Sequence, residues 1–253
     1  MELRSMVLIE TLRLTFGPLL GWHFRVRTEG AGNVPEDGGG VIVSNHRSYS
    51  DPLIMGYAIK RYINFAAGSH LYGVPGTAPL MNLVGFFSMD IYGGDAGDRS
   101  LDTASRLLAN GELVGIFPEG IESFMHVNAV SKVSSFKTGF AKLALENRVP
   151  IIPVAIAPET EKGLVKIPGL LVTPFVRHPR AREGVDLITY RRVTLRIGRP
   201  IDLSAYYDEV LSKDLIDRVA AKVRRIVIKL YDGEDLDRFL TGEKRFEFAR
   251  DRV

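Results

Sequence analysis

Short, continuously apolar runs alternate along this chain with longer stretches that repeat apolar residues every three or four positions. Such runs are typical of strands covered on both faces, and the longer spacing is typical of helices with one buried face. Strands are predicted at residues 41–44, 64–67, 86–92, 113–117, 151–156 and 193–197, with a weaker candidate at 170–175. Helices are predicted at residues 52–60, 101–110, 138–147 and 213–231. The alternation predicts a single α/β domain with a mostly parallel or mixed sheet flanked by helices.

The composition supports a folded core and excludes several kinds of site. Of the 253 residues, 45% are hydrophobic and none is cysteine, which excludes a disulfide scaffold, a thiolate zinc site and a cysteine nucleophile. The 33 basic residues exceed the 30 acidic ones by three, too few to indicate a nucleic-acid partner. The five histidines show no metal-ligand spacing, so no metal site is predicted. The mean hydropathy of +0.04 is high for a chain with this many charges.

The N-terminal segment contains no run long enough to span a bilayer, which takes about 20 apolar residues. Its best stretch, residues 14–24, is interrupted by two glycines and Pro18. Trp22, the single tryptophan, lies among apolar residues flanked by arginines, as an interfacial anchor does. We therefore expect residues 1–30 to form an amphipathic helical segment that associates with the membrane surface. A helix packed on the protein's own core is the alternative.

The remainder of the chain is expected to divide into an α/β core at residues 31–205 and a C-terminal part at residues 206–253. The C-terminal part begins with the basic helix predicted at 213–231 and ends in a tail dense in both charges. Because the helix carries one apolar face with most of its basic residues elsewhere, the pattern favours packing on the core. A membrane-surface role is the alternative.

A polar turn between a predicted strand and a predicted helix contains a histidine and an aspartate five positions apart. His46 and Asp51 follow the strand at 41–44, and Pro52 is typical of a first helical position. A carboxylate that accepts from one imidazole nitrogen leaves the other as a base for an attacking hydroxyl. The alternative is that Asp51 only caps the helix and His46 is an ordinary loop residue.

A second turn presents a carboxylate where another buried strand ends. Residues 113–120 read LVGIFPEG and place Glu119 after the strand. Sites in α/β sheets lie beyond the carboxyl ends of strands, so Glu119 and His46 are expected to share one crevice if their strands are parallel. The alternative is a plain Pro-x-Gly turn. Residues 149–156, VPIIPVAI, predict a strand with an irregular start beside this crevice.

Four segments in this order resemble the motifs of the glycerolipid acyltransferases, the lysophosphatidic acid acyltransferase family. They are Asn45-His46-x4-Asp51, Phe117-Pro118-Glu119-Gly120, Phe136-Lys137-x-Gly139 and Val149-Pro150-Ile151-Ile152-Pro153-Val154. The resemblance covers about residues 35–200. It implies an α/β fold with the active site at the strand ends, in which His46 is the general base and Asp51 orients it.

The resemblance also implies the substrates and the place of action. The donor would be an acyl-CoA or acyl-carrier-protein thioester, with no cofactor and no metal. The partner would be lipid at a membrane surface, and the enzyme would be cytoplasmic and peripheral on the inner face of the cell membrane. The substrate-binding positions that match are Asn45, Arg47, Ser48, Phe117, Pro118, Glu119, Gly120 and Lys137.

Two positions depart from the family's phosphate-binding pattern. Ile91 and Glu122 stand where the family commonly has arginine. A carboxylate repels a phosphate dianion, and a lost charge-assisted contact costs about 1.5–3 kcal/mol. The acceptor head group is therefore open: either another cation supplies the charge, or the acceptor has no phosphate there. The candidate cations are Lys132, Lys137, Arg177, Arg180 and Arg182.

The predicted function is transfer of a fatty acyl group to a hydroxyl of a glycerolipid acceptor, lysophosphatidate or a related lysolipid, in phospholipid biosynthesis. The alternatives are transfer to a non-phosphate lipid and a non-catalytic lipid-binding protein of the same fold. The chain has no G-x-S-x-G elbow, which excludes a serine hydrolase of that type. Residues 38–40 are three glycines that precede a strand, the wrong context for a nucleotide loop.

Overall fold

The computed structural model describes residues 11, 15, 17–73, 76–83, 85–89, 95–120, 133–176 and 178–234. Across these ranges one seven-stranded sheet has the order β1-β7-β6-β2-β5-β3-β4. The strands are β1 Val26–Glu29, β2 Gly40–Ser44, β3 Ile63–Gly68, β4 Phe86–Met89, β5 Leu113–Ile116, β6 Ile151–Ile167 and β7 Val185–Ile197. Neighbours from β6 to β4 run parallel, whereas β7 is antiparallel to β6 and parallel to β1. The prediction of one α/β domain with a mixed sheet is confirmed.

The longer helices occur where the periodicity predicted them. They are α2 Asp51–Ala58, α5 Asp95–Ala109, α7 Gly139–Glu146 and α9 Lys213–Asp232. Shorter helices, which were not predicted, are α3 Ser69–Tyr72, α4 Thr77–Leu83 and α8 Gly169–Val172, with 3-10 turns at Ala31–Asn33, Pro179–Glu183 and Ser204–Tyr206. The short ones were missed because one or two helical turns carry too few residues to reveal a period.

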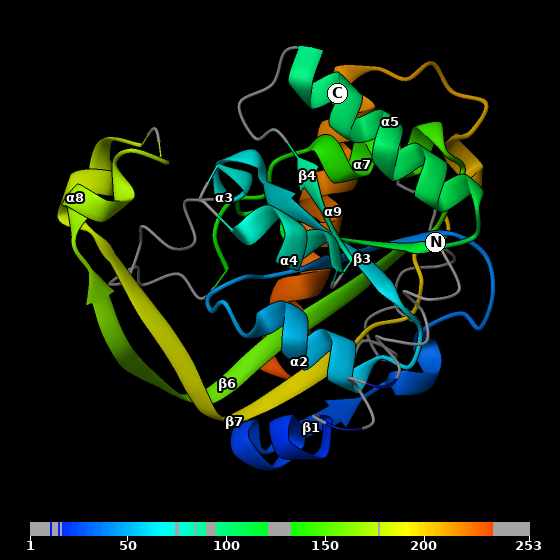
Figure 1. The fold of residues 1–253 in the computed structure, drawn as a ribbon. Coiled ribbons are helices and arrows are strands. Elements are labelled where there is room, and N and C mark those ends of the chain that lie inside the picture. The colour runs from blue at the N-terminus through cyan, green and yellow to red at the C-terminus, as the bar shows by residue number, and fades with distance from the viewer. Residues whose placement is uncertain are drawn as a thin grey trace.

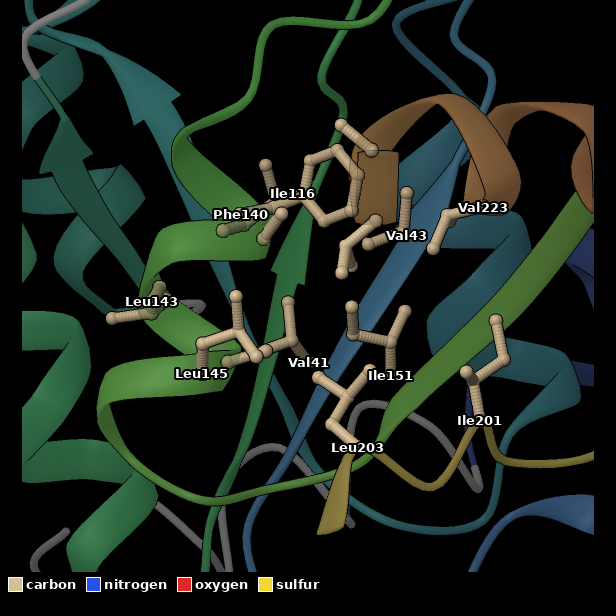
Figure 2. Packing of buried hydrophobic residues seen from close by; sticks show 14 of the residues in the cluster. Val41, Val43, Ile116, Phe140, Leu143, Leu145, Ile151, Ile201, Leu203 and Val223 are labelled. Atoms are coloured by element: carbon tan, nitrogen blue, oxygen red, sulfur yellow. The ribbon is translucent and has the colours of Figure 1, made fainter. Parts of the chain in front are cut away.

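Side chains of the central strands alternate between two cores, one on each face of the sheet. In β2, Val41 and Val43 face the layer formed by α5, α7 and α9, and Ile42 faces α2. Figure 2 shows the first of these cores, where Val43 lies near Phe140 of α7 and Val223 of α9. The apolar face of α9 is therefore buried against the sheet, as its periodicity favoured.

The strand predicted at residues 170–175 is wrong, because this part of the chain contains helix α8. Pro168 stands just before α8 and Pro174 just after it, which leaves room for a single turn. A run of six apolar residues has no period that separates a strand from a buried helical turn.

The last two strands are much longer than predicted. β6 continues eleven residues past the predicted end at Ile156, and β7 begins eight residues before the predicted start at Val193. Their distal halves pair with each other through three register shifts and carry α8 at the far end (Figure 1). We call residues 159–192 the arm. Its strands were missed because exposed residues interrupt the apolar pattern on which the prediction relied.

The N-terminal segment is helical at residues 17–24 and then enters the sheet as β1. The sheet thus begins before residue 31, where the core was expected to start. Leu19 and Trp22 are 57% and 77% exposed, whereas Phe24 is buried. Within the described ranges, no helix combines the length and the apolarity that crossing a bilayer needs.

Several predictions fall outside the described residues. They concern the end of the strand at 90–92, the start of the N-terminal segment, the tail after residue 234, and the side chains of Ile91, Glu122, Lys132 and Arg177.

Candidate active site

Two neighbouring parallel strands bring the predicted turns to one edge of the sheet. β2 and β5 pair in parallel with Val43 opposite Ile116. The turn that contains His46 therefore leaves the sheet beside the turn that contains Glu119. The two turns thus lie beside each other at the carboxyl edge of the sheet, as the two motifs predicted, and we call the region between them the crevice.

The His46 imidazole and the Asp51 carboxylate form the centre of the site. His46 Nδ1 lies 2.8 Å from Asp51 Oδ2. The same oxygen accepts the backbone N–H of Arg47 at 2.8 Å and of Ser48 at 2.9 Å. Because Asp51 is fully buried and ties the turn back on itself, the ring is held in one orientation. With its Nδ1–H donated to Asp51, the imidazole carries its lone pair on Nε2.

Asp51 does more than begin a helix. It is the first residue of α2, yet its side chain accepts from the turn that precedes the helix. Asp51 Oδ1 is buried without a hydrogen-bond partner among the described residues. The buried phenol of Tyr190, on β7, lies near this carboxylate: burial first, and then the Asp51 charge, raises the pKa of Tyr190 well above its ordinary value. The phenol therefore stays protonated beside the carboxylate.

Glu119 connects the two turns through backbone groups. Its Oε1 accepts the N–H of His46 at 3.0 Å, and its Oε2 accepts the N–H of Ser134 at 3.0 Å. The side chain is only 2% exposed. We predicted a substrate-binding role for Glu119, and the structure shows both oxygens engaged in holding the site together. Burial raises the pKa of Glu119, and the two N–H donors oppose that rise.

The raised pKa of Glu119 predicts how stability responds to pH. A carboxyl that binds its proton more tightly in the folded state stabilises most below its unfolded pKa, and this contribution is lost as pH rises through the folded pKa. The free energy of unfolding should therefore fall from about pH 4.5, the ordinary value, upward. Urea unfolding across this range should show the fall in the wild type and lose it in Glu119→Gln. Glu146→Gln, at an exposed position, should keep it; parallel profiles for Glu119→Gln and the wild type would contradict the prediction.

A cation from the C-terminal helix completes this support. Arg224 of α9 donates from Nε to the carbonyl of Ser134 at 2.7 Å and from its guanidinium to the carbonyl of Val133 at 3.0 Å. Ser134 also donates its backbone N–H to one carboxylate oxygen of Glu119, and the other oxygen accepts the N–H of His46. A chain of contacts thus runs from α9 to the His46 turn, which Arg224 helps to hold in place.

Replacing Arg224 should therefore weaken the site without touching it. Arg224→Ala removes charge-assisted hydrogen bonds to two carbonyls, at a cost of about 1.5–3 kcal/mol in stability. We expect kcat to fall more than KM changes, because His46 loses its support while the substrate surfaces remain. Arg225→Ala, at an exposed position on the same helix, is the matched control. Equal kinetics for the two variants would contradict this role.

The Phe117–Gly120 turn packs against the His46 side chain and against Lys137. The Phe117 ring stacks on the His46 ring, with centroids 4.0 Å apart and planes 19° apart. Lys137 donates its backbone N–H to the carbonyl of Pro118 at 2.9 Å. Gly120 has φ +62°, and a Cβ there would lie 3.5 Å from Lys137 Nζ, so the ammonium group lies directly over this glycine.

Asn45, Arg47 and Ser48, which were predicted to bind substrate, contact the protein itself. Asn45 exchanges two hydrogen bonds with the backbone of Ile156, at 2.8 and 2.9 Å, and so fastens the end of β2 to β6. Ser48 Oγ donates to the carbonyl of Ile188 on β7. Arg47 makes a two-point ion pair with Glu161 on β6, which raises the pKa of Arg47. All three anchor the His46 turn to the last two strands.

The sequence did not identify four residues that support the site. They are Ser134, Glu161, Tyr190 and Arg224. Arg224 alone left a signal, since it lies next to the apolar positions of a periodic helix. The others act from loop or strand positions that carry no local pattern.

Among the candidate cations, the described ones lie in different places. Lys137 borders the crevice, whereas Arg180 and Arg182 belong to the 3-10 turn that packs on α8 at the end of the arm. Within the described residues, no group of three or more His, Asp or Glu side chains is arranged to hold a metal ion.

The part of the chain that forms this site matches a known protein family. The family model described as Acyltransferase matches residues 25–157, more than half of the chain. The chain belongs to the acyltransferase family. The matched range contains both turns of the crevice, the strands that carry them and the start of β6.

Relatives within the acyltransferase family are distant in sequence. An uncharacterized protein of Mycobacterium tuberculosis is 24% identical over 234 residues, covering 83% of this chain and 63% of that protein. The 1-acyl-sn-glycerol-3-phosphate acyltransferase of Bacillus subtilis is 29% identical over 136 residues, covering 53% of this chain and 64% of that enzyme. The match thus spans somewhat less than two thirds of the length of either relative.

A solved acyltransferase has a similar fold. The crystal structure of the 1-acyl-sn-glycerophosphate acyltransferase PlsC from Thermotoga maritima matches with a TM-score of 0.56 and 25% sequence identity. The match covers 89% of this chain and 80% of that one.

Proposed function

We propose that this protein transfers a fatty acyl group from a thioester donor to a hydroxyl of a glycerolipid acceptor, lysophosphatidate or a related lysolipid, in phospholipid biosynthesis. The observation that carries the proposal is the His46–Asp51 pair at the carboxyl edge of the sheet, in which Nδ1 of the part-exposed imidazole lies 2.8 Å from the fully buried carboxylate. Membership of the acyltransferase family supports it, as does the likeness to enzymes whose names specify lysophosphatidate-type acceptors.

In the proposed step, His46 acts as general base. Its Nε2 takes the proton from the acceptor hydroxyl while the oxygen attacks the thioester carbonyl. The C–S bond then breaks, the ester forms, and the leaving thiolate takes the proton back from the imidazolium. Asp51 stabilises that imidazolium and fixes its tautomer.

The hydrogen-bond donors and cations near the crevice suggest which group meets negative charge on the substrates. The N–H groups of Arg47 and Ser48 already donate to Asp51, and the N–H of Gly120 donates to the carbonyl of Phe117 at 3.2 Å. We therefore assign the electrostatic role to Lys137, whose ammonium lies over Gly120. It would meet the negative charge of an acceptor head group or of the attacked carbonyl oxygen.

The donor would be acyl-CoA or an acyl-carrier protein, with no cofactor, and the enzyme would act as a peripheral protein on the inner face of the cell membrane. Exposed apolar side chains near the catalytic turn and the N-terminus support contact with lipid. Tyr49 and Leu53 flank the start of α2 and are 47% and 51% exposed. Leu19 and Trp22 on the N-terminal helix are more exposed still.

Release of free thiol from acyl-CoA, measured with purified protein and a panel of lipid acceptors, tests the proposal. Mass spectrometry of the product then identifies the acceptor. We expect turnover with lysophosphatidate or a related lysolipid. A product formed only on a non-phosphate lipid would redefine the acceptor, and no turnover with any donor and acceptor would favour the non-catalytic lipid-binding protein.

A further inference from the structure

The arm ends in a small folded unit with its own apolar core. Val172, Val176, Ala181 and Val185 are buried there, with Ile167 and Phe175 packed against them. A Cβ at Gly169 would lie 2.1 Å from the carbonyl oxygen of Arg182, so α8 and the following 3-10 turn pack backbone against backbone. The unit is therefore well packed, and its own apolar side chains occupy its interior.

Four more apolar side chains of the same unit point outward. Leu164 and Val165 are 65% and 59% exposed, and Leu170 and Leu171 are 83% and 62% exposed. They lie within eight consecutive positions at the end of the arm, which Figure 1 shows at the side of the molecule. Because the core of the unit is complete without them, their exposure indicates a surface that contacts something else. We call these four residues the arm tip.

Positive charge surrounds the arm tip. Residues 162–186 contain five Lys or Arg and two acidic residues, a net +3 that equals the net charge of the whole chain. In the described structure, Lys162, Lys166, Arg180 and Arg182 are all exposed. Exposed apolar side chains and exposed cations on one unit complement an anionic lipid surface, where apolar groups enter the interface and cations meet the head groups.

The base of the arm is attached to the catalytic turn. Arg47 binds Glu161 where the arm begins, and Ser48 donates to Ile188 on the returning strand. From Glu161 to Ile167, at about 3.3 Å per residue, the strand runs about 20 Å. The arm tip and the His46 turn thus belong to one connected support.

We propose that the arm tip docks on the surface of an anionic bilayer and holds the crevice at the membrane, where a lipid acceptor would be met. The inference rests on the proposed function for the lipid acceptor, but vesicle binding requires no turnover. Failure of docking and failure of catalysis are therefore separate outcomes.

Cosedimentation with phosphatidylglycerol-rich vesicles tests the docking. The full-length variant Leu170→Glu/Leu171→Glu should bind about tenfold more weakly or worse, because two apolar side chains leave the interface. Removing one cation with Lys166→Gln or Arg182→Gln should weaken binding about fivefold, and salt should reduce the difference. Val210→Glu/Leu211→Glu is the matched control, since this pair is also exposed but lies before α9.

Tryptophan fluorescence from the arm tip provides a second measurement of membrane contact. Trp22 is the single tryptophan, so a Trp22→Phe/Leu170→Trp protein carries its only indole on the arm tip. Its emission should shift to the blue on anionic vesicles and stay unchanged on phosphatidylcholine vesicles. Trp22→Phe/Val210→Trp should show no shift.

The variants also separate docking from chemistry. The Leu170→Glu/Leu171→Glu protein should keep wild-type turnover with detergent-dispersed substrates and lose turnover on vesicles. Unchanged vesicle binding, or an equal loss in the Val210→Glu/Leu211→Glu control, would overturn the proposal. The proposal would also be overturned if the Leu170→Glu/Leu171→Glu protein bound vesicles like the wild type but no longer bound acidic acyl-carrier protein or no longer self-associated.

Discussion

Acyl transfer by the His46→Asn variant is expected to fall about 10²- to 10⁴-fold in kcat, the range that a positioned general base contributes. The asparagine amide can still donate to Asp51, as His46 Nδ1 does at 2.8 Å, but it has no basic nitrogen for the acceptor hydroxyl. The loss should therefore be in the chemical step, with little change in KM.

Two comparisons keep that result interpretable. His46→Ala also removes the ring that stacks on Phe117, so it should lose activity to the same degree and some stability as well. Thermal unfolding of His46→Asn should stay close to that of the wild type. Full thiol release by a correctly folded His46→Asn protein would show that the imidazole is not the base.

Asp51→Asn should have the second largest effect, again about 10²- to 10⁴-fold in kcat. The amide oxygen can still accept the N–H groups of Arg47 and Ser48, so the turn keeps its shape. The amide oxygen in that place also still accepts the Nδ1–H of His46, but the negative charge that stabilises the imidazolium is lost. The measurement is kcat for acyl transfer alongside the unfolding midpoint.

Comparison with Asp51→Ala separates the effect of the lost charge on activity from an effect on folding. Asp51→Ala leaves the N–H groups of Arg47 and Ser48 without their acceptor inside a buried turn, at about 1–3 kcal/mol each. It should therefore lose both activity and stability. Asp202→Asn is a control, because Asp202 accepts a backbone N–H from Ser204 at 2.9 Å in an exposed turn away from the crevice. Wild-type activity in a folded Asp51→Asn protein would show that the negative charge of Asp51 is not needed.

Much of the fold was predictable because buried strands and amphipathic helices leave local patterns. β2 reads as a continuous apolar run, and α9 repeats its apolar residues every three or four positions. The arm was not predictable in this way. Its first strand is exposed at every position from 159 to 166, and its second is half-buried at every position from 186 to 189, so neither shows a buried apolar run. The apolar turn of α8 resembles a strand when only its composition is considered.

The candidate site was predictable only in part, for a similar reason. His46 and Asp51 are five residues apart, so their approach depends on one local turn. Glu119 reaches His46 across 73 positions, and Arg224 reaches Ser134 across 90. Contacts at such separations depend on which strands and helices become neighbours, and local spacing does not encode this.

The sequence by itself determined the groups for the proposed chemistry at the turn: a candidate base, a carboxylate to orient it, and a strand and a helix on either side to present them. The tertiary structure decided what supports that chemistry. Pairing of β2 with β5 places Glu119 under the backbone of His46, packing of α9 supplies Arg224, and the long β6–β7 pair adds Glu161 and Tyr190. The physical reason is that a buried carboxylate or backbone group is stable only with partners, and the sheet gathers those partners from distant parts of the chain.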